Sequence, residues 1–411
     1  MTRQIVSMKL HRPITQPADS RAGFLVPAIL VALLVIMAGV ALVLDQLWLE
    51  NASVEMQAAV DASVLAAGRQ LATDDLLKPN FNAQNQIDKA RNRANDIASG
   101  NRVAGQPVNL EESGSIRIGR RIDNPSSGRV NFVETTNRPN SVRVIAHRSR
   151  RNGNPIALFF RQLTGQSSGD VSCRAEATIE NRIVGFRPLE HLPIPVLPIA
   201  ILETDSISQR TDTWQVAIEQ RLGADQFRLD EKTGQVVRGA DGIPEITLRF
   251  EGDEKTDEKR NVLLIAPQSR WQRVRWRRAI KSGWTRDDFA KRNAEISLPR
   301  SEEQVLRFFT TRLTNHRFAE LFDTVLGQCR IVFLTRNCSE SDDSHFDSVN
   351  CHRVVAGRVM DVRIGNNGSF ELVLQPGVLT TPTAILSDDV KSSSEKSFAR
   401  NRYIYKLRLT H

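Results

Sequence analysis

The stretch AGFLVPAILVALLVIMAGVALVL, residues 22–44, decides the fold, because it has no charged side chain and almost every residue is apolar. A helix rises about 1.5 Å per residue, so this stretch reaches roughly 34 Å, enough for a hydrocarbon core about 30 Å thick. A cleavable signal peptide has a shorter apolar region of about 7–15 residues. The sequence therefore predicts one transmembrane helix over residues 22–49, with a buried helix of a soluble protein as the alternative.

The charges on the two sides of this predicted span differ in sign. The basic residues before it are Arg3, Lys9, Arg12 and Arg21. After it come acidic residues, and no basic residue occurs before Arg69. Because basic flanks stay in the cytoplasm, residues 1–21 are expected to form a cytoplasmic tail. The sequence thus predicts a single-pass protein of the cell inner membrane with a periplasmic or otherwise extracytoplasmic body.

The rest of the chain has the composition of a globular protein, since 40% of all residues are hydrophobic and 25% are charged. The formal net charge of +9 favours contact with anionic surfaces such as lipid headgroups or acidic polysaccharide. An exported domain rarely meets nucleic acid, so no nucleic-acid partner is expected. A basic surface that is simply solvated would explain the same charge.

The helix is expected to continue beyond the span as an alanine-rich stalk over residues 50–75, because apolar residues recur there at a spacing near 3.6. Small side chains let another helix approach closely, and a carboxylate among them needs a polar partner. One interpretation is a helix–helix contact just outside the membrane. The other is a stiff stalk whose alanines serve only helix formation. The contact would use Gln57, Ala58, Asp61, Ala62 and Leu65.

The order of features around the span is similar to that of a known family. The sequence RAG at residues 21–23 precedes the apolar run, Asp45 follows it, and residues 56–68 read MQAAVDASVLAAG. Over residues 20–70 this order resembles the TadE/TadG-like N-terminal region of Flp (tight-adherence) pilus-assembly proteins. That family shows a basic-glycine start, an apolar span, an aspartate at its outer end, and then a Leu-Gln and Ala-Asp-Ala-Ala signature.

This chain departs from the family pattern at a few positions. Met56 stands where the signature has leucine, and Val60 and Ser63 replace alanines. Pilins cleaved by prepilin peptidase carry glutamate at the fifth position after a glycine, whereas Ala28 occupies that position after Gly23. The resemblance therefore implies an uncleaved, TadG-like component rather than a polymerising pilin.

The resemblance implies a membrane-anchored structural or scaffolding component of a bacterial Flp/Tad pilus-assembly or secretion system. Its partners would be the lipid bilayer and other membrane proteins of that system, with a homo-oligomer through the stalk as a further option. Larger family members add a von Willebrand-type domain whose metal site needs Asp-x-Ser-x-Ser. Residues 205–208, DSIS, have the wrong spacing, so no metal is predicted.

The exported body has the pattern of an α+β fold. A polar helix is expected over residues 82–99 and a short helix over residues 156–163. Alternating strands are expected over residues 115–121, 129–134, 141–148 and 171–184. The proline-rich residues 188–200 would connect this α+β domain, residues 76–187, to a mixed, strand-rich C-terminal unit, residues 201–411.

The C-terminal unit is expected to contain further strands and one long helix. The expected strands cover residues 245–250, 261–265 and 380–385, and a hairpin joins residues 358–364 to residues 370–374. The helix is expected over residues 302–326, because apolar residues recur there at helical spacing between a capping sequence and Gly327.

An arginine- and tryptophan-rich stretch follows the second of these strands. If it is a strand, Arg273, Arg275 and Arg277 occupy one face and Trp276 the other. The arginines and Trp276 would then form a contact for an anionic surface, with lipid or glycan as the ligand. A solvated basic strand with Trp276 buried is the alternative.

Three of the four cysteines, Cys329, Cys338 and Cys351, lie close together in the sequence, and Cys173 lies apart. In an oxidising compartment two of the three could form a disulfide, and free thiols are the alternative. Zinc sites usually bring pairs such as Cys-x2-Cys, and none occurs here.

No sequence motif for catalysis or cofactor binding is present. The chain lacks Gly-x-Ser-x-Gly, His-Glu-x-x-His and the glycine-rich phosphate and dinucleotide loops. We therefore expect no enzyme, no catalytic residue and no cofactor. An anchored binder of envelope polymer or anionic lipid is the main alternative to scaffolding, and an exported hydrolase is the less favoured one.

Overall fold

The computed structural model contains both helices and strand-rich sheets, which confirms the expectation of a mixed fold that begins with one long apolar helix. It describes residues 25–110, 114–123, 130–205, 210–250, 260–268, 271, 273–289, 294–299, 304–311, 316–336, 338, 348–365, 369–387 and 400–410. The chain divides into Met1–Glu55 with His147–Ser172, and Met56–Ala146 with Cys173–His411. We call these the smaller and the larger unit.

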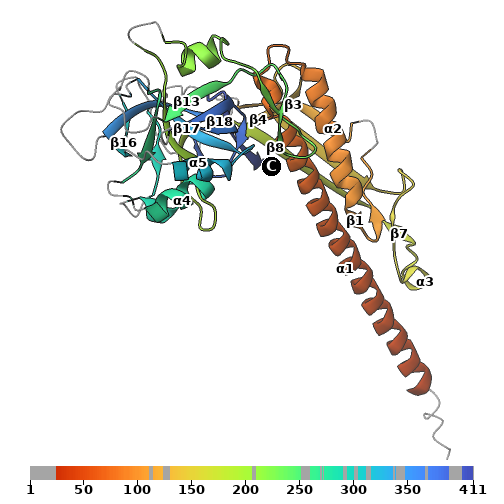
Figure 1. Cartoon of the computed structure of the whole chain (residues 1–411). Helices are drawn as coiled ribbons and strands as arrows, with labels where there is room; N and C mark the ends of the chain where they lie inside the picture. The colour runs from red at the N-terminus through yellow and green to blue at the C-terminus, as the bar shows by residue number, and fades with distance from the viewer. Residues whose placement is uncertain are drawn as a thin grey trace, which may run out of the picture. The chain divides into compact units, whose positions relative to one another are not determined.

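Helix α1, Leu25–Gln70, is unbroken over 46 residues (Figure 1). Among the described residues it is the one helix long and apolar enough to cross a membrane. Its apolar side chains stay exposed along the first part, as at Leu34 and Ile36. The second part confirms that the helix continues into the predicted stalk, where alanine favours helix over other conformations, but α1 ends at Gln70 and the stalk was predicted to residue 75.

In the smaller unit, residues 156–169 form a small motif instead of the predicted helix over residues 156–163. Strand β6, Ile156–Ala157, pairs antiparallel with β7, Ser168–Gly169. Helix α3, Arg161–Thr164, is only one turn long and ends at Gly165, whose φ of 74° is left-handed. The helix prediction was therefore too long, because its first residues pair with another strand.

Asp45, the aspartate at the end of the apolar run, holds this motif. Its side chain is buried, and its Oδ1 accepts hydrogen bonds from the backbone N–H groups of Phe159 and Phe160 at 2.9 and 3.4 Å. The Trp48 ring, one turn further along α1, lies 5.0 Å from the Phe159 ring. The carboxylate thus satisfies N–H groups at the start of α3 that no helical bond can satisfy.

Replacing Asp45 by alanine is expected to loosen this motif by about 1 kcal/mol, the usual cost of losing such a capping carboxylate. Hydrogen–deuterium exchange of the Phe159 and Phe160 amides should accelerate roughly fivefold, since 1.4 kcal/mol corresponds to a factor of ten. Glu50→Ala is the control, because Glu50 is exposed and accepts a hydrogen bond from Gln46, which is its one side-chain partner among the described residues and lies on the same helix. Equal exchange in both variants would show that Asp45 does not hold the motif.

The larger unit contains a six-stranded sheet. Its strands are, in spatial order, β20 Leu379–Thr380, β22 Ile404–Leu409, β8 Val171–Glu180, β5 Ser141–Arg148, β3 Ile116–Asp123 and β4 Val130–Glu134. The predicted strands over residues 115–121, 129–134 and 141–148 are confirmed as β3, β4 and β5. The single strand predicted over residues 171–184 is instead two strands, β8 and then β9, and β9 belongs to a separate three-stranded sheet. Strand β22, an alternating run that is not among the predicted strands, pairs with β8, so the C-terminal end of the chain completes this sheet.

The last turns of α1 pack directly on this sheet. A Cβ at Gly68 would lie 2.9 Å from Leu407 Cδ1 and 3.4 Å from Ala177 Cβ, so glycine allows the helix to approach β22 and β8. Helix α2, Ala83–Gly100, confirms the predicted polar helix and is capped by Asn82. Its Gln86 is buried and donates a hydrogen bond to the Leu71 carbonyl at 3.1 Å.

A seven-stranded sheet forms the other main part of the larger unit. Its strands are, in order, β13 Ile246–Phe250, β19 Phe370–Pro376, β18 Ser348–Ile364, β16 Leu306–Thr311, β14 Val262–Ala266, β10 Val196–Leu202 and β17 Cys329–Thr335. Strand β17 pairs with both β10 and β18, so the ring β18–β16–β14–β10–β17 closes into a five-stranded barrel. Closure removes unpaired strand edges, and β19 and β13 extend from the second half of β18.

Aromatic side chains from β16, β17 and the segment after α4 pack together. Trp284 is fully buried and stacks on Phe333 with ring centroids 5.6 Å apart. Phe308 lies 4.6 Å from Phe333. Helix α4, Arg273–Ser282, packs on β10, and α5, His316–Asp323, packs on β18 and α4. Burial of such rings contributes much of the stability of a core.

Several short elements complete the described chain. They are η2 Asp74–Leu77, β1 Arg102–Val103, β2 Gln106–Pro107, β9 Ile183–Phe186, η3 Gln215–Glu219, β11 Phe227–Leu229, β12 Val236–Arg238, η5 Arg286–Asp288, β15 Ile296–Ser297 and β21 Ala384–Leu386. The predicted strands over residues 245–250 and 261–265 are confirmed, as is the β18–β19 hairpin, whose residues 366–368 lie outside the described chain.

The predicted helix over residues 302–326 is wrong in its first half. The described residues form β16 and then α5, while residues 301–303 and 312–315 lie outside the described chain. The helical stripe used Val305 and Phe309, but Val305 is exposed, and Phe308 and Thr310 are the buried residues. The segment therefore follows the alternating pattern of a strand and not the helical spacing, because β16 is paired on both edges, with β14 and with β18.

Candidate functional site

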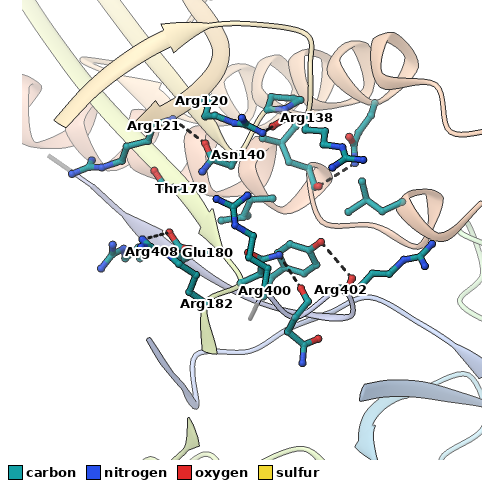
Figure 2. Close-up of a pocket in the computed structure, with 18 of the residues that line it drawn as sticks. Arg120, Arg121, Arg138, Asn140, Thr178, Glu180, Arg182, Arg400, Arg402 and Arg408 are labelled. Carbon is teal, nitrogen blue, oxygen red and sulfur yellow. Dashed lines mark hydrogen bonds and ion pairs between the residues drawn. The ribbon is translucent and has the colours of Figure 1, made fainter. Parts of the chain in front are cut away.

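The most distinctive cavity among the described residues is an arginine-lined pocket of about 950 Å³ in the larger unit. Seven arginines line it, and Glu180 is the one acidic residue in its lining. These arginines are Arg120, Arg121, Arg138, Arg182, Arg400, Arg402 and Arg408. In Figure 2, Arg120, Arg121 and Arg138 lie along one side and Arg182, Arg400 and Arg402 along the other.

The pocket is built from segments distant in sequence. Strand β3 contributes Arg120 and Arg121, and β22 contributes Arg408. Asn140 fixes the first side, because its Oδ1 accepts a hydrogen bond from the Arg121 backbone N–H at 2.9 Å. Asn181 fixes the second, because its amide donates to the Asn401 carbonyl at 2.8 Å. The strands and these two asparagines therefore position the arginine backbones.

Glu180 is already engaged by arginine. Arg182 donates to both of its oxygens, at 2.9 and 3.3 Å. Burial alone would raise the pKa of the Glu180 carboxyl, but the hydrogen bonds and charge of Arg182 and the charge of Arg408 outweigh it and hold the pKa below its usual value. Glu180 therefore stays ionised and neutralises part of the charge at one end of the pocket.

Apart from Arg121, Arg182 and Arg408, the arginines of the pocket form no ion pair with any described residue. Arg138, Arg400 and Arg402 are exposed at the rim, and Arg138 adopts a positive φ of 47°. Arg120 makes only a long hydrogen bond, 3.4 Å, to the Arg138 carbonyl. Guanidinium groups that line a cavity and are not engaged by a carboxylate have free donors for an anionic ligand.

A second charge cluster on the same sheet shares Arg121 with the pocket, but its charges are paired with one another. Glu176 accepts hydrogen bonds from Arg143 at 3.0 and 2.7 Å and from Ser141 at 3.0 Å, and Arg121 lies 3.6 Å away. Arg143 also lies over the Phe132 ring at 4.3 Å. The charged and polar groups of this cluster are paired with one another, so we assign the cluster a structural role.

Only part of the predicted helix–helix contact lies on the uncovered side of α1. Ala58 and Ala62 are exposed, while Gln57, Asp61 and Leu65 are half-buried. The opposite side of the helix is buried within the described chain, at Met56, Ala59, Val60, Ser63, Val64 and Ala67. Gln57 donates a hydrogen bond to Asp61 at 2.8 Å, so the stalk itself supplies a polar partner for the carboxylate.

The arginine- and tryptophan-rich stretch is a helix, so its interpretation as a strand with alternating faces is wrong. In α4 the buried residues are Trp276, Ala279 and Ile280, a helical spacing that turns Trp276 into the core. Arg275 is half-buried and Arg277 exposed, and the side chain of Arg273 lies outside what the structure describes. Trp276 therefore cannot contact an external surface together with these arginines.

All four cysteines, each within the described chain, are free thiols. Cys338 and Cys351 are buried, and Cys329 is half-buried. Burial raises the pKa of the Cys329 and Cys338 thiols to about 12 and also raises that of Cys351. A thiol whose pKa is raised in this way stays protonated near neutral pH and is a poor nucleophile. No group of three or more potential metal ligands occurs among the described residues.

Comparison with known proteins adds no family or relative. The chain matches no protein family, no curated protein and no solved structure.

The arginine-lined pocket was not predicted from the sequence, because its arginines are spread from position 120 to position 408 and belong to separate strands and loops. The surplus of scattered arginines was the one available signal.

Proposed function

We propose that this chain is a membrane-anchored scaffolding component of a TadG-like pilus-assembly or secretion system, with a cytoplasmic N-terminus and an exported body. The observation that carries the proposal is α1, an exposed apolar segment that continues without a break into a stalk. The basic residues before the span and the resemblance over residues 20–70 support the orientation and the system.

The stalk offers the contact surface for a partner helix. Ala58 and Ala62 are four residues apart and exposed, so they lie on one side of the helix, where small side chains permit close approach. Val54, one turn earlier, is 69% exposed and extends the same side. The occupant we propose is the corresponding helix of a second anchored protein of the assembly, which would lie at the same height above the membrane.

Cross-linking in native membranes tests this contact. Ala58→Cys, treated with a short bifunctional maleimide, is expected to link to a second protein that has its own apolar helix. Asn92→Cys is the matched control, because Asn92 is equally exposed but belongs to α2. Links to this same chain would indicate a homo-oligomer through the stalk, and equal linking from both positions would contradict a specific contact.

The control variant also tests the orientation. Asn92→Cys should react with a membrane-impermeant maleimide on intact spheroplasts, since the native cysteines are buried or half-buried. Reaction only after lysis would place the body in the cytoplasm and reject the proposal.

A further inference from the structure

We propose that the arginine-lined pocket binds a compact ligand carrying two or more phosphate groups. The pocket lies wholly in the larger unit, so the inference does not depend on the membrane anchor or on the assembly role. The inference goes beyond the anchor and the assembly role, because it assigns a class of ligand to residues that take part in neither of them.

Charge density favours phosphate over a carboxylate ligand. Seven arginines and one carboxylate, Glu180, line the cavity. Arg121 is paired with Glu176 and Arg182 with Glu180, so these two do not contribute to the excess of positive charge. That excess comes mainly from Arg120, Arg138, Arg400 and Arg402. A phosphate monoester carries about −1.5 to −2 charges and three acceptor oxygens, whereas a carboxylate carries one charge. Guanidinium forks donate in parallel pairs to such oxygens, so several arginines can share one phosphate group.

The placement of the unpaired arginines favours more than one phosphate. Arg138 lies on one side of the pocket and Arg400 and Arg402 on the other (Figure 2). No described carboxylate pairs with any of these three, so a ligand that reaches both sides would neutralise them together. A cavity of about 950 Å³ accommodates such a molecule, since small-molecule sites typically measure about 300–1,000 Å³.

The remaining lining indicates that the ligand also has a non-ionic part. Leu71, Leu76 and Phe81 line the pocket beside the arginines, and Tyr405 contributes a ring whose hydroxyl donates to the Arg402 carbonyl at 3.4 Å. Apolar walls next to a few polar groups are the usual composition of a small-ligand site. A phosphorylated sugar or the headgroup region of a multiply phosphorylated lipid has this combination.

Calorimetric titration of the full chain in neutral detergent with inorganic tripolyphosphate tests the proposal. Saturable binding is expected, weakening as salt rises because rim arginines are screened. Arg400→Ala with Arg402→Ala should weaken it at least about tenfold, since a charged hydrogen bond contributes about 1.5–3 kcal/mol and 1.4 kcal/mol is tenfold. Citrate, a tricarboxylate, should bind clearly more weakly.

Arg275→Ala with Arg277→Ala on α4 is the matched control, because it removes the same charge outside the pocket. Unchanged tripolyphosphate affinity in this variant is expected. An equal loss of affinity in the two double variants, or citrate binding as tight as tripolyphosphate binding, would show that only net charge matters and would overturn the proposal. The absence of tripolyphosphate binding would also overturn it.

Vesicles identify the source of the phosphate. Flotation with phosphatidylcholine vesicles, with and without cardiolipin, uses a lipid that carries two phosphates. Cardiolipin binding that requires Arg400 and Arg402, together with tripolyphosphate binding, supports the proposal with a lipid headgroup as the source. Tripolyphosphate binding alone supports it with a soluble phosphorylated ligand.

Discussion

Replacing Asp74 by asparagine is expected to lower the free energy of unfolding of the larger unit by about 3 kcal/mol. Asp74 in η2 accepts hydrogen bonds from the Arg358 guanidinium and, at 2.6 Å, from the Val378 backbone N–H. The Arg358 side chain is 10% exposed and also donates to the Gly327 carbonyl. Asparagine would leave a buried guanidinium without its counter-charge, which costs more than the pair itself contributes.

Urea unfolding followed by the fluorescence of the buried tryptophans would measure this loss. Asp88→Asn is the control, because Asp88 is half exposed and its pair with Arg91 lies on the surface of α2, where such pairs contribute at most about 1 kcal/mol. The double change of Asp74→Asn with Arg358→Met should recover part of the loss, because it removes the unpaired charge. A loss no greater than that of Asp88→Asn would show that the pair is unimportant.

Replacing Glu245 by glutamine is expected to stabilise the larger unit at pH 8 by up to about 3 kcal/mol and to change little at pH 5. Burial raises the pKa of the Glu245 carboxyl to about 7, although the backbone N–H groups of Phe227 and Gln226 partly offset it by donating at 2.6 and 3.1 Å. The nearby charges of Asp225 and Asp241 raise the pKa further.

The sign of the effect follows from proton binding. Between the ordinary glutamate pKa of 4.5 and about 7, the folded chain holds a proton on Glu245 that the unfolded chain has lost. The free energy of unfolding therefore falls as pH rises through this window and levels off above it. Glutamine keeps an oxygen for the two N–H groups and does not ionise, so the contribution of this group disappears.

Chemical unfolding at pH 5 and pH 8 would test this difference. Other carboxyls act in the opposite direction, since hydrogen bonds hold the pKa of Asp75 and Glu180 below their usual values despite burial. These carboxyls are the same in the variant and the parent, so the difference between their free energies of unfolding reports Glu245 alone. Glu320→Gln, a change at an exposed position of α5, serves as the control. Equal pH dependence in the Glu245 variant and the parent would refute the assignment.

The amino-acid sequence by itself predicts the elements whose environment is local. The apolar run gives α1, because a helix satisfies its own backbone hydrogen bonds without neighbours. The alternating runs give β3, β4 and β5, and the Gly-Asn-Asn-Gly stretch separates β18 from β19. These patterns depend on side chains a few positions apart, so no knowledge of the rest of the chain is needed.

Only the tertiary structure decides which of two local patterns prevails. Residues 306–311 fit both a helical stripe and a strand, and pairing with β14 and β18 selects the strand. Residues 273–282 fit an alternating strand, but the burial of Trp276, Ala279 and Ile280 against β10 selects the helix. In both cases the deciding free energy comes from partners far away in the sequence.

The sequence alone determined that one uncharged helix precedes an arginine-rich body, because length and composition are enough for that statement. It did not determine that Arg120 and Arg138 would face Arg400 and Arg402. That arrangement arises when the last strand, β22, joins the sheet formed by β8, β5 and β3. Long-range strand pairing brings distant residues into one cavity, and no periodicity within a segment records it.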